Sequence, residues 1–352
     1  MSGPHGRRGL ALLITITIAL AANSATPAAG RPGEKRLSVA GLGRGEGPVR
    51  SRILTGAATR RLAFIPSDAW GGTYTTRSGS KVTIFASSQY PVDPAANQAA
   101  ADFMDTLVHG SEISKVKIYF APSEEVAILC HSVEADGCYS PANAEIVTIG
   151  QDTQWSTVEE VVTHEYGHHI AANRDNEPWP AIAYGTKRWA TYEGVCQKEA
   201  TGVAFPGDEA DHYFQNPGES FAESFLHLNE VKLGVPETPW GYDPMFAPTP
   251  QAMDAIEKDV LKPWTTYALK RWSGRFISRG QQRVLKLNTP LDGVAAVQVK
   301  GPRGSTVHLT GTPQVRALSP SVVGGLVCGE RSLTARVRAG GSGRYTVTAA
   351  IP

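Results

Sequence analysis

The chain has 352 residues, of which 41% are hydrophobic and 19% are charged, and its formal net charge is +1. This length and apolar content exclude disorder throughout and predict about two domains, each with a core. The charge is unevenly spread, with +8 on residues 1–65, −16 on residues 66–273 and +9 on residues 274–352. An acidic central region argues against nucleic acid as a partner, although ordinary solvation of a surface is an equal explanation of the charge.

The N-terminus predicts a secretory signal peptide over residues 1–25. Arg7 and Arg8 precede an uncharged apolar run from Leu10 to Ala22, and small residues follow it. The run is shorter than the roughly 20 residues with which a helix crosses a bilayer. We therefore expect a secreted, extracellular protein with no stable membrane insertion after signal cleavage, the alternative being a retained anchor.

Residues 26–65 are rich in Gly, Arg and Ala and have no sustained apolar period. This composition indicates a linker or a pro-segment. A pro-segment would dock its basic side chains on the acidic region that follows and inhibit that region until it is removed. A linker would make no such contact.

Residues 66–272 combine strand and helix patterns, which predict an α+β domain. Strand patterns at 73–76 and 81–86 flank a Ser-Gly-Ser turn, and Asp93 is placed to cap a helix that ends at Val108. Further strands are predicted at 115–120 and 145–149, and further helices at 123–129, 187–199, 217–229 and 251–261.

Residues 273–352 change to Thr, Val, Arg and Gly in short alternating runs, a pattern typical of a small all-β, sandwich-like domain. The runs lie at 284–287, 295–300, 305–309, 332–337 and 344–348. His308 is the only histidine in this region. We expect an accessory role, either in stabilising the chain or in contacting a cell-wall polymer through the basic surface.

Four cysteines fit an oxidising, extracellular destination. Cys130 and Cys138 enclose a short polar loop and form the simplest pair. Cys196 is then expected to pair with Cys328, which has no partner in its own region. Four cysteines allow three connectivities, and the sequence alone leaves all three open.

The stretch His164-Glu165-Tyr166-Gly167-His168 places two histidines four residues apart, on one face of a helix. Both imidazoles can then reach one metal ion, while Glu165 points aside toward a water that the metal activates. Ser156 and Glu159 fit a capping box, and valines at 158, 161 and 162 supply an apolar stripe, so the helix is predicted independently of the motif. Gly167 indicates room for a close neighbour. The alternative is a solvated His-rich helix without metal.

A catalytic zinc usually has three protein ligands, so a third is needed. The metzincin extension of the motif fails, because Ala171 and Arg174 stand where it requires Gly and His. The helix pattern that starts at Asn216 instead places Glu219 and Glu223 one turn apart. Glu219 could bind zinc while Glu223 accepts the outer N–H of a histidine ligand. A solvated acidic face of that helix is the alternative.

These two stretches resemble the gluzincin zinc metallopeptidases, the group of thermolysin-like and lethal-factor-like enzymes. The resemblance implies Zn2+ bound by His164, His168 and Glu219, with Glu165 as general base. It also implies Glu223 as the partner of a histidine ligand, although thermolysin-like members have Asp at that place. A Tyr or His that stabilises the oxyanion is implied as well, and Tyr213 and His212 are the candidates. Finally, it implies that the strand 145–149 is a sheet edge to which substrate adds as a strand.

The sequence therefore predicts a secreted zinc-dependent endopeptidase that acts on peptide or protein substrates, with a zincin-like α+β domain followed by the all-β domain. Two alternatives stay open. One is a non-catalytic, polymer-binding module with a structural or silent metal site, and the other is a zinc hydrolase of cell-wall stem peptides. The acidic side chains at 208, 209 and 211 lack an EF-hand pattern, which favours a solvated turn over a calcium site.

Overall fold

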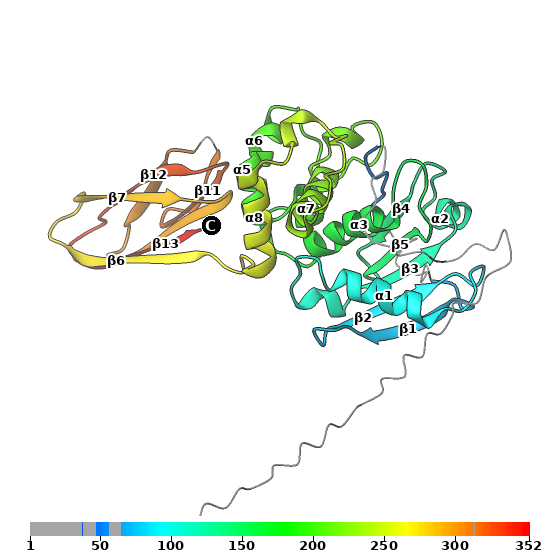
Figure 1. Cartoon of the computed structure of the whole chain (residues 1–352). Coiled ribbons are helices and arrows are strands. Elements are labelled where there is room, and N and C mark those ends of the chain that lie inside the picture. Colours follow the sequence, from blue (N-terminus) through cyan, green and yellow to red (C-terminus); the bar gives the residue numbers. More distant parts are fainter. Residues whose placement is uncertain (1–36, 38–46, 56–64, 313) are drawn as a thin grey trace, which may run out of the picture. The chain divides into compact units, whose positions relative to one another are not determined.

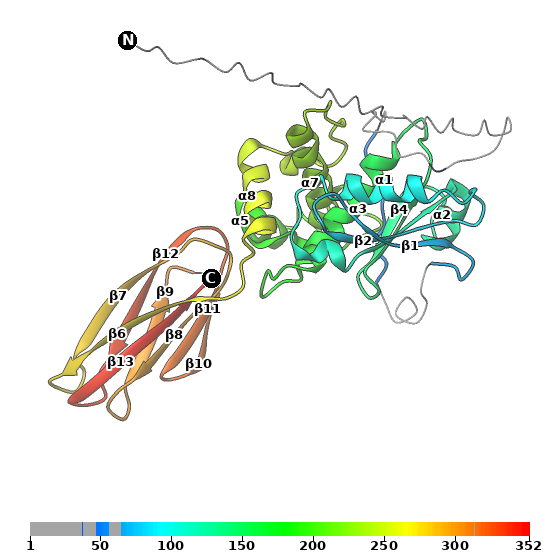
Figure 2. The same ribbon diagram turned by 60° about the horizontal axis from the view of Figure 1, so that its bottom comes forward.

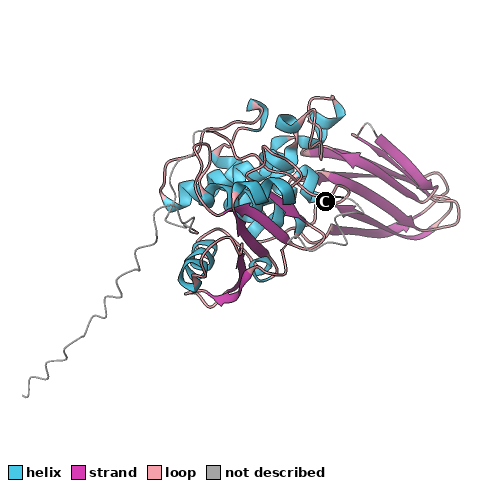
Figure 3. Ribbon diagram, turned by 90° about the vertical axis from the view of Figure 1, so that its right-hand side faces the viewer, coloured by secondary structure: helices cyan, strands magenta, loops and turns pink. Residues whose placement is uncertain are grey.

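The computed structural model describes Leu37 and residues 47–55, 65–312 and 314–352. The expected signal peptide and most of residues 26–65 lie outside the described residues. The described elements form an α+β region followed by an all-β region that contains no helix (Figures 1 and 3). Within the described residues, no helix is both long and apolar enough to cross a membrane.

A five-stranded sheet with the strand order β1-β2-β3-β5-β4 forms the centre of the α+β region. Its strands are β1 (Trp70–Thr75), β2 (Lys81–Ala86), β3 (Lys117–Ala121), β4 (Gly137–Ser140) and β5 (Glu145–Ile149). The three inner strands are parallel, and β1 and β4 run antiparallel to their neighbours at the two ends. The bounds of β5 agree with the sequence prediction.

The expectation that the 145–149 strand is a sheet edge is wrong. β4 pairs with it in antiparallel register from Gly137–Thr148 to Ser140–Glu145, so β5 is an inner strand. From sequence, the start of β4 is expected to belong to the polar loop between Cys130 and Cys138. Four residues of mixed polarity are too short to show the alternation by which a strand is recognised. The edge on this side of the sheet is therefore β4.

The helices of this region are α1 (Pro94–Met104), α2 (Ser123–Leu129), α3 (Val158–Ala172), α4 (Ala181–Tyr184), α5 (Lys187–Glu193), α6 (Val195–Ala200), α7 (Pro217–Leu233) and α8 (Pro250–Leu261). Asp93 caps α1 as expected, but the helix ends at Met104, before Val108. The expected helix 187–199 is divided, because Gly194 adopts a left-handed conformation with φ of 64° between α5 and α6. A left-handed residue ends an α-helix.

The N-terminus of α3 is fixed by a capping box one residue later than expected. The Thr157 hydroxyl accepts from the Glu160 N–H at 3.2 Å, and the Glu160 carboxylate accepts from the Thr157 N–H at 2.8 Å. The Ser156 hydroxyl instead donates to Asp136 at 2.9 Å. Both registers fit the same Ser/Thr-x-x-Glu pattern, so the pattern could not separate them.

α3 packs beside β4 and β5 on one side and crosses α7 closely on another (Figures 1 and 2). At the crossing, a Cβ on Gly167 would lie 2.8 Å from the Cα of Ala222. A glycine is therefore required here, because any side chain would push the two backbones apart. This is the close neighbour that Gly167 indicates from sequence. Because of this close crossing, residues 164–168 of α3 lie opposite the first turns of α7.

Replacing Gly167 by Ala is expected to lower the free energy of unfolding by about 1–3 kcal/mol, the usual cost of overpacking. The gain in helix propensity, about 1 kcal/mol, offsets only part of it. Denaturant unfolding measures the change. Gly72→Ala is the control, because a Cβ on Gly72 would meet no atom within 4 Å. Equal losses in the two variants would contradict the packing argument.

The all-β region consists of two sheets, ordered β10-β11-β8-β13-β6 and β7-β12-β9. Apolar residues of both sheets form one buried cluster, in which Phe276 and Val297 of the first sheet join Leu287 and Leu333 of the second. The strands are β6 (Ala268–Phe276), β7 (Gln282–Thr289), β8 (Gly293–Lys300), β9 (Thr306–Thr310), β10 (Gln314–Ser319), β11 (Val322–Val327), β12 (Arg331–Arg338) and β13 (Gly343–Ile351).

Four of these strands contain a run predicted from sequence, β9 begins one residue after the predicted run 305–309, and β6, β10 and β11 were missed. β10 is exposed along its whole length and β6 along most of it, so neither shows apolar alternation. β6 also spans the expected boundary at residues 272/273, which places the start of the all-β region at Ala268.

Both expected disulfides are present. Cys130 pairs with Cys138, and Cys196 of α6 pairs with Cys328, which follows β11. The second bridge joins the α+β region to the all-β region. Beside it, the Asp292 N–H donates to the Thr191 hydroxyl at 3.0 Å.

Candidate metal centre

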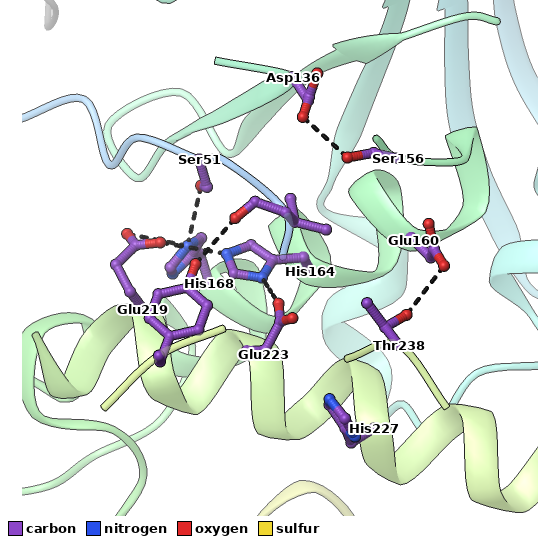
Figure 4. Close-up of polar contacts among 12 residues, drawn as sticks. Ser51, Asp136, Ser156, Glu160, His164, His168, Glu219, Glu223, His227 and Thr238 are labelled. Atoms are coloured by element: carbon purple, nitrogen blue, oxygen red, sulfur yellow. Dashed lines mark hydrogen bonds and ion pairs between the residues drawn. The ribbon is translucent and has the colours of Figure 1, made fainter. Parts of the chain in front are cut away.

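His164, His168 and Glu219 come together where α3 crosses α7 (Figure 4). One ligand atom from each lies within 4.8 Å of the other two, and all three side chains are fully buried. The Nε2 atom of His164 is 3.3 Å from one Glu219 carboxylate oxygen, and that of His168 is 3.4 Å from the other. These three side chains, all predicted from sequence, form a group that could hold a metal ion.

Glu223 fixes the orientation of His164. Its carboxylate lies 2.8 Å from His164 Nδ1, one turn along α7 from Glu219. Because an ionised carboxylate only accepts, Nδ1 carries a proton in this contact, and Nε2 is the nitrogen that faces Glu219. Glu223 thus occupies the position that the spacing of the two acids predicts.

The buried charges of the group depend on one another. Burial alone would lower the pKa of His164, but its contacts with Glu219 and Glu223 outweigh burial and raise that pKa to about 10. Burial opposes ionisation of Glu219 as well, yet the two histidines hold the pKa of its carboxyl far below the usual value. The pKa of His168 is lowered, chiefly by burial. The anionic Glu219 is therefore stabilised by the positive charge it faces.

Glu165 lies next to this group and close to the Ser51 hydroxyl. Its side chain is fully buried, and neither carboxylate oxygen accepts a hydrogen bond from the protein. Burial raises its pKa to about 8, although the Ser51 hydroxyl acts to lower that pKa. Gly137 of β4 makes room for it, because a Cβ there would lie 2.8 Å from Glu165 Oε1. A buried carboxylate without hydrogen bonds is costly unless another group, such as a metal-bound water, satisfies it.

The donor set fits a divalent metal ion. Two imidazole nitrogens and one carboxylate are ligands that transition metals such as zinc accept, and three protein ligands leave a position for water or substrate. The unsatisfied carboxylate of Glu165 at the same place is what such an arrangement requires. The identity of the metal is not fixed by these residues.

Tyr213, rather than His212, contacts the group. The Tyr213 hydroxyl donates to Glu219 at 2.9 Å. His212 instead lies 2.8 Å from Asp208 through Nδ1 and stacks on Phe205 with ring centroids 3.7 Å apart. Of the two candidates from sequence, only the tyrosine reaches the ligands.

Three neighbours of the group were not predicted. The Tyr242 ring stacks on His164 at 6.3 Å, and its hydroxyl is 3.1 Å from that of Tyr213. The Ser51 hydroxyl lies 3.3 Å from His168 Nε2 (Figure 4). Tyr242 and Ser51 are in segments without a motif, so no sequence signal could have found them.

The third is Glu209, for which the expectation of a solvated turn is wrong. Its carboxylate accepts from the Ile53 N–H at 3.1 Å and from the Asn216 side chain at 2.8 Å. Burial, followed by the charge of Glu219, raises its pKa to about 9. The acidic composition of residues 208–211 is typical of a solvated turn and does not indicate contacts with distant residues such as Ile53.

No protein-family model and no curated protein matches this chain. Among solved structures, one similar chain is described as the structure of IMPa from Pseudomonas aeruginosa in complex with an O-glycopeptide. It is 8% identical, the match covers 66% of this chain and 37% of that one, and the TM-score is 0.18. Similarity at this level does not show a shared fold.

Proposed function

We propose that the chain is a secreted zinc-dependent endopeptidase of gluzincin type, with a zincin-like catalytic domain. The observation that carries this proposal is the convergence of His164, His168 and Glu219 beside a buried Glu165 whose carboxylate oxygens accept no hydrogen bond from the described residues. The signal-peptide pattern and the two disulfides support secretion.

In this proposal each residue has one task. His164, His168 and Glu219 hold the zinc, which when bound polarises a carbonyl and lowers the pKa of a water to roughly 7. Glu165 accepts a proton from the attacking water and passes it to the leaving amine. Glu223 keeps the His164 ring in place, and the Tyr213 hydroxyl, which donates to Glu219 in the structure, would turn its proton to the oxyanion once Glu219 binds zinc.

The number of ligands favours catalysis over a structural site. A structural zinc is usually closed by four protein ligands. In the described part of the chain, the group contains three His, Cys, Asp or Glu side chains, so one position is left for water or substrate. This is the reason for preferring an enzyme to a polymer-binding module with a silent metal.

Metal analysis combined with cleavage profiling of a peptide library by mass spectrometry tests the proposal. We expect one zinc per chain and internal cleavage of peptides that stops when the zinc is chelated. A chain that binds one zinc but cleaves no peptide, even after the segment that covers the metal group is displaced, would refute the catalytic role.

Replacing Tyr213 by Phe is expected to lower kcat on the order of 100-fold with little change in zinc content, as for loss of one oxyanion donor. Steady-state kinetics and metal analysis measure the two quantities. Tyr192→Phe is the control, because the Tyr192 hydroxyl contacts Thr249, at 2.9 Å, rather than the metal ligands. An unchanged kcat in Tyr213→Phe would leave this tyrosine as a packing residue.

A further inference from the structure

The candidate metal centre is closed to solvent. His164, Glu165, His168 and Glu219 are each 0% exposed. A centre that hydrolyses peptides must admit an extended chain, so part of what covers it has to move. Residues 48–54, drawn in blue in Figure 4, run past the ligands and point Ser51 at His168.

On one side, this segment is hydrogen-bonded to the edge of the sheet. The Leu54 N–H donates to the carbonyl of Tyr139 in β4 at 2.9 Å, and the Tyr139 N–H donates to the Arg52 carbonyl at 3.0 Å. The Asp136 N–H donates to the Arg50 carbonyl at 2.9 Å. Ile53 and Tyr139 form a parallel bridge. The segment therefore lies along β4 in the manner of an added strand, with one parallel bridge and three main-chain hydrogen bonds.

On the other side, three side chains bind the backbone of the segment. The Tyr242 hydroxyl donates to the Val49 carbonyl at 3.0 Å, and the Tyr213 hydroxyl accepts from the Ser51 N–H at 3.0 Å. Glu209 accepts from the Ile53 N–H. Contacts to main-chain N–H and C=O groups depend little on sequence, and strand addition is a common way to bind an extended peptide.

The side chains of the segment alternate only between Val49 and Ile53, and Leu54 is buried directly after Ile53. Val49, Ser51 and Ile53 are 1%, 4% and 6% exposed, whereas Arg50 points outward and pairs with the exposed Glu134. Exposed ion pairs contribute little, so the main-chain contacts and the buried face hold the segment. A linker that makes no contact with this region, one of the two alternatives from sequence, does not describe residues 48–54.

The register directs three carbonyls of the segment away from the metal ligands. The carbonyls of Val49, Arg50 and Arg52 accept from Tyr242, Asp136 and Tyr139. The atom placed beside His168 is the Ser51 hydroxyl oxygen. In this register a side-chain oxygen, not one of these three carbonyls, faces the metal ligands.

We propose that the groove between β4 and the Tyr213–Tyr242 side is a binding site for an extended polypeptide, and that residues 48–54 are its intramolecular occupant, which excludes substrate in the full chain. The contacts above define the groove and its occupant, and only the exclusion of substrate rests on the proposed function. Displacing the segment should therefore open the metal centre whether or not peptides are cleaved.

The variant Ile53→Pro tests this in the zinc-loaded full chain. Proline lacks the N–H that Glu209 accepts and removes a buried aliphatic side chain at the centre of the strand pairing. Loss of one hydrogen bond alone shifts an open–closed equilibrium by roughly 2- to 12-fold. We expect faster amide exchange in residues 49–55, removal of zinc by a chelator about tenfold faster, and peptide turnover raised by a similar factor.

Two controls separate displacement from general damage. Ile53→Val keeps the N–H and most of the side chain, and it should retain the slow exchange of the segment. Gly241→Ala should displace the segment from its other end, because a Cβ there would lie 2.2 Å from Pro48 Cγ. Adding Pro48→Gly to that variant removes the clash and should restore slow exchange and slow zinc removal.

A synthetic peptide of residues 47–55, added to Ile53→Pro, should return zinc removal to the wild-type rate, and a scrambled peptide should not. Fast amide exchange in the segment with an unchanged rate of zinc removal would overturn the proposal, since the segment would then not close the centre. Lower turnover in both Ile53→Pro and Gly241→Ala, with zinc removal unchanged, would make the segment a structural strand. If zinc removal accelerates while no variant cleaves peptides, the result supports residues 48–54 as the occupant of the groove and contradicts the proposed function.

Discussion

Replacing Glu165 by Gln is expected to leave zinc content unchanged and to lower peptide turnover at least about 100- to 10,000-fold, the usual cost of losing a general base. Gln has the same shape but cannot accept the proton of the attacking water. Gly137 leaves space for either side chain, so the fold should be retained. Metal analysis and peptide cleavage measure the two effects, both in the wild-type chain and in Ile53→Pro.

The matched control for this prediction is Glu257→Gln in α8, where the carboxylate pairs with Lys232 at 2.8 Å, outside the metal ligand set. Its turnover should be that of the wild type. Cleavage by zinc-loaded Glu165→Gln at the wild-type rate would rule out the assigned mechanism.

Replacing His168 or Glu219 by Ala is expected to weaken zinc binding by more than about 100-fold. Even partners of the ligands usually contribute 10- to 100-fold in metal affinity, and these two residues are proposed as ligands themselves. Competition with a chelator of known affinity measures the change, and circular dichroism checks that each variant is folded.

Glu223→Gln provides the comparison within the same helix. Gln can still accept from His164 Nδ1 but carries no charge, so zinc binding should weaken by about 10-fold or less, the low end for a partner of a ligand. One tightly bound zinc in Glu219→Ala would move the third ligand to another residue and remove the main support for the gluzincin assignment.

The candidate metal group could be predicted from sequence because each pair of its residues lies within a few positions along the chain. The histidines are four residues apart on one helix, and the two acids are one turn apart on another, so helix periodicity already places each pair on one face. The strand 145–149, the helix 123–129 and the cap at Asp93 were confirmed for the same reason. Each depends on residues that are neighbours in the chain.

The surroundings of the group depend on contacts between distant segments, which periodicity does not encode. Tyr242 reaches His164 from a loop after α7, and Ser51 reaches His168 from a segment 117 positions earlier. The edge position of β4 follows from pairing with β5, and its four residues show no strand pattern of their own. The sequence therefore indicated which residues form the candidate metal group but not what covers them.

The two disulfides secure the C-terminal region of the chain but not its N-terminal segment. All four cysteines lie between residues 130 and 328, and the bridge from Cys196 to Cys328 spans 132 positions. A single peptide-bond cleavage between α8 and β6 would leave the all-β region attached until that bridge is also reduced. A single cleavage between residue 55 and β1 would leave residues 48–54 held by noncovalent contacts alone, so that they could dissociate on dilution. One proteolytic event can thus release the N-terminal occupant, while loss of the C-terminal region requires both hydrolysis and reduction.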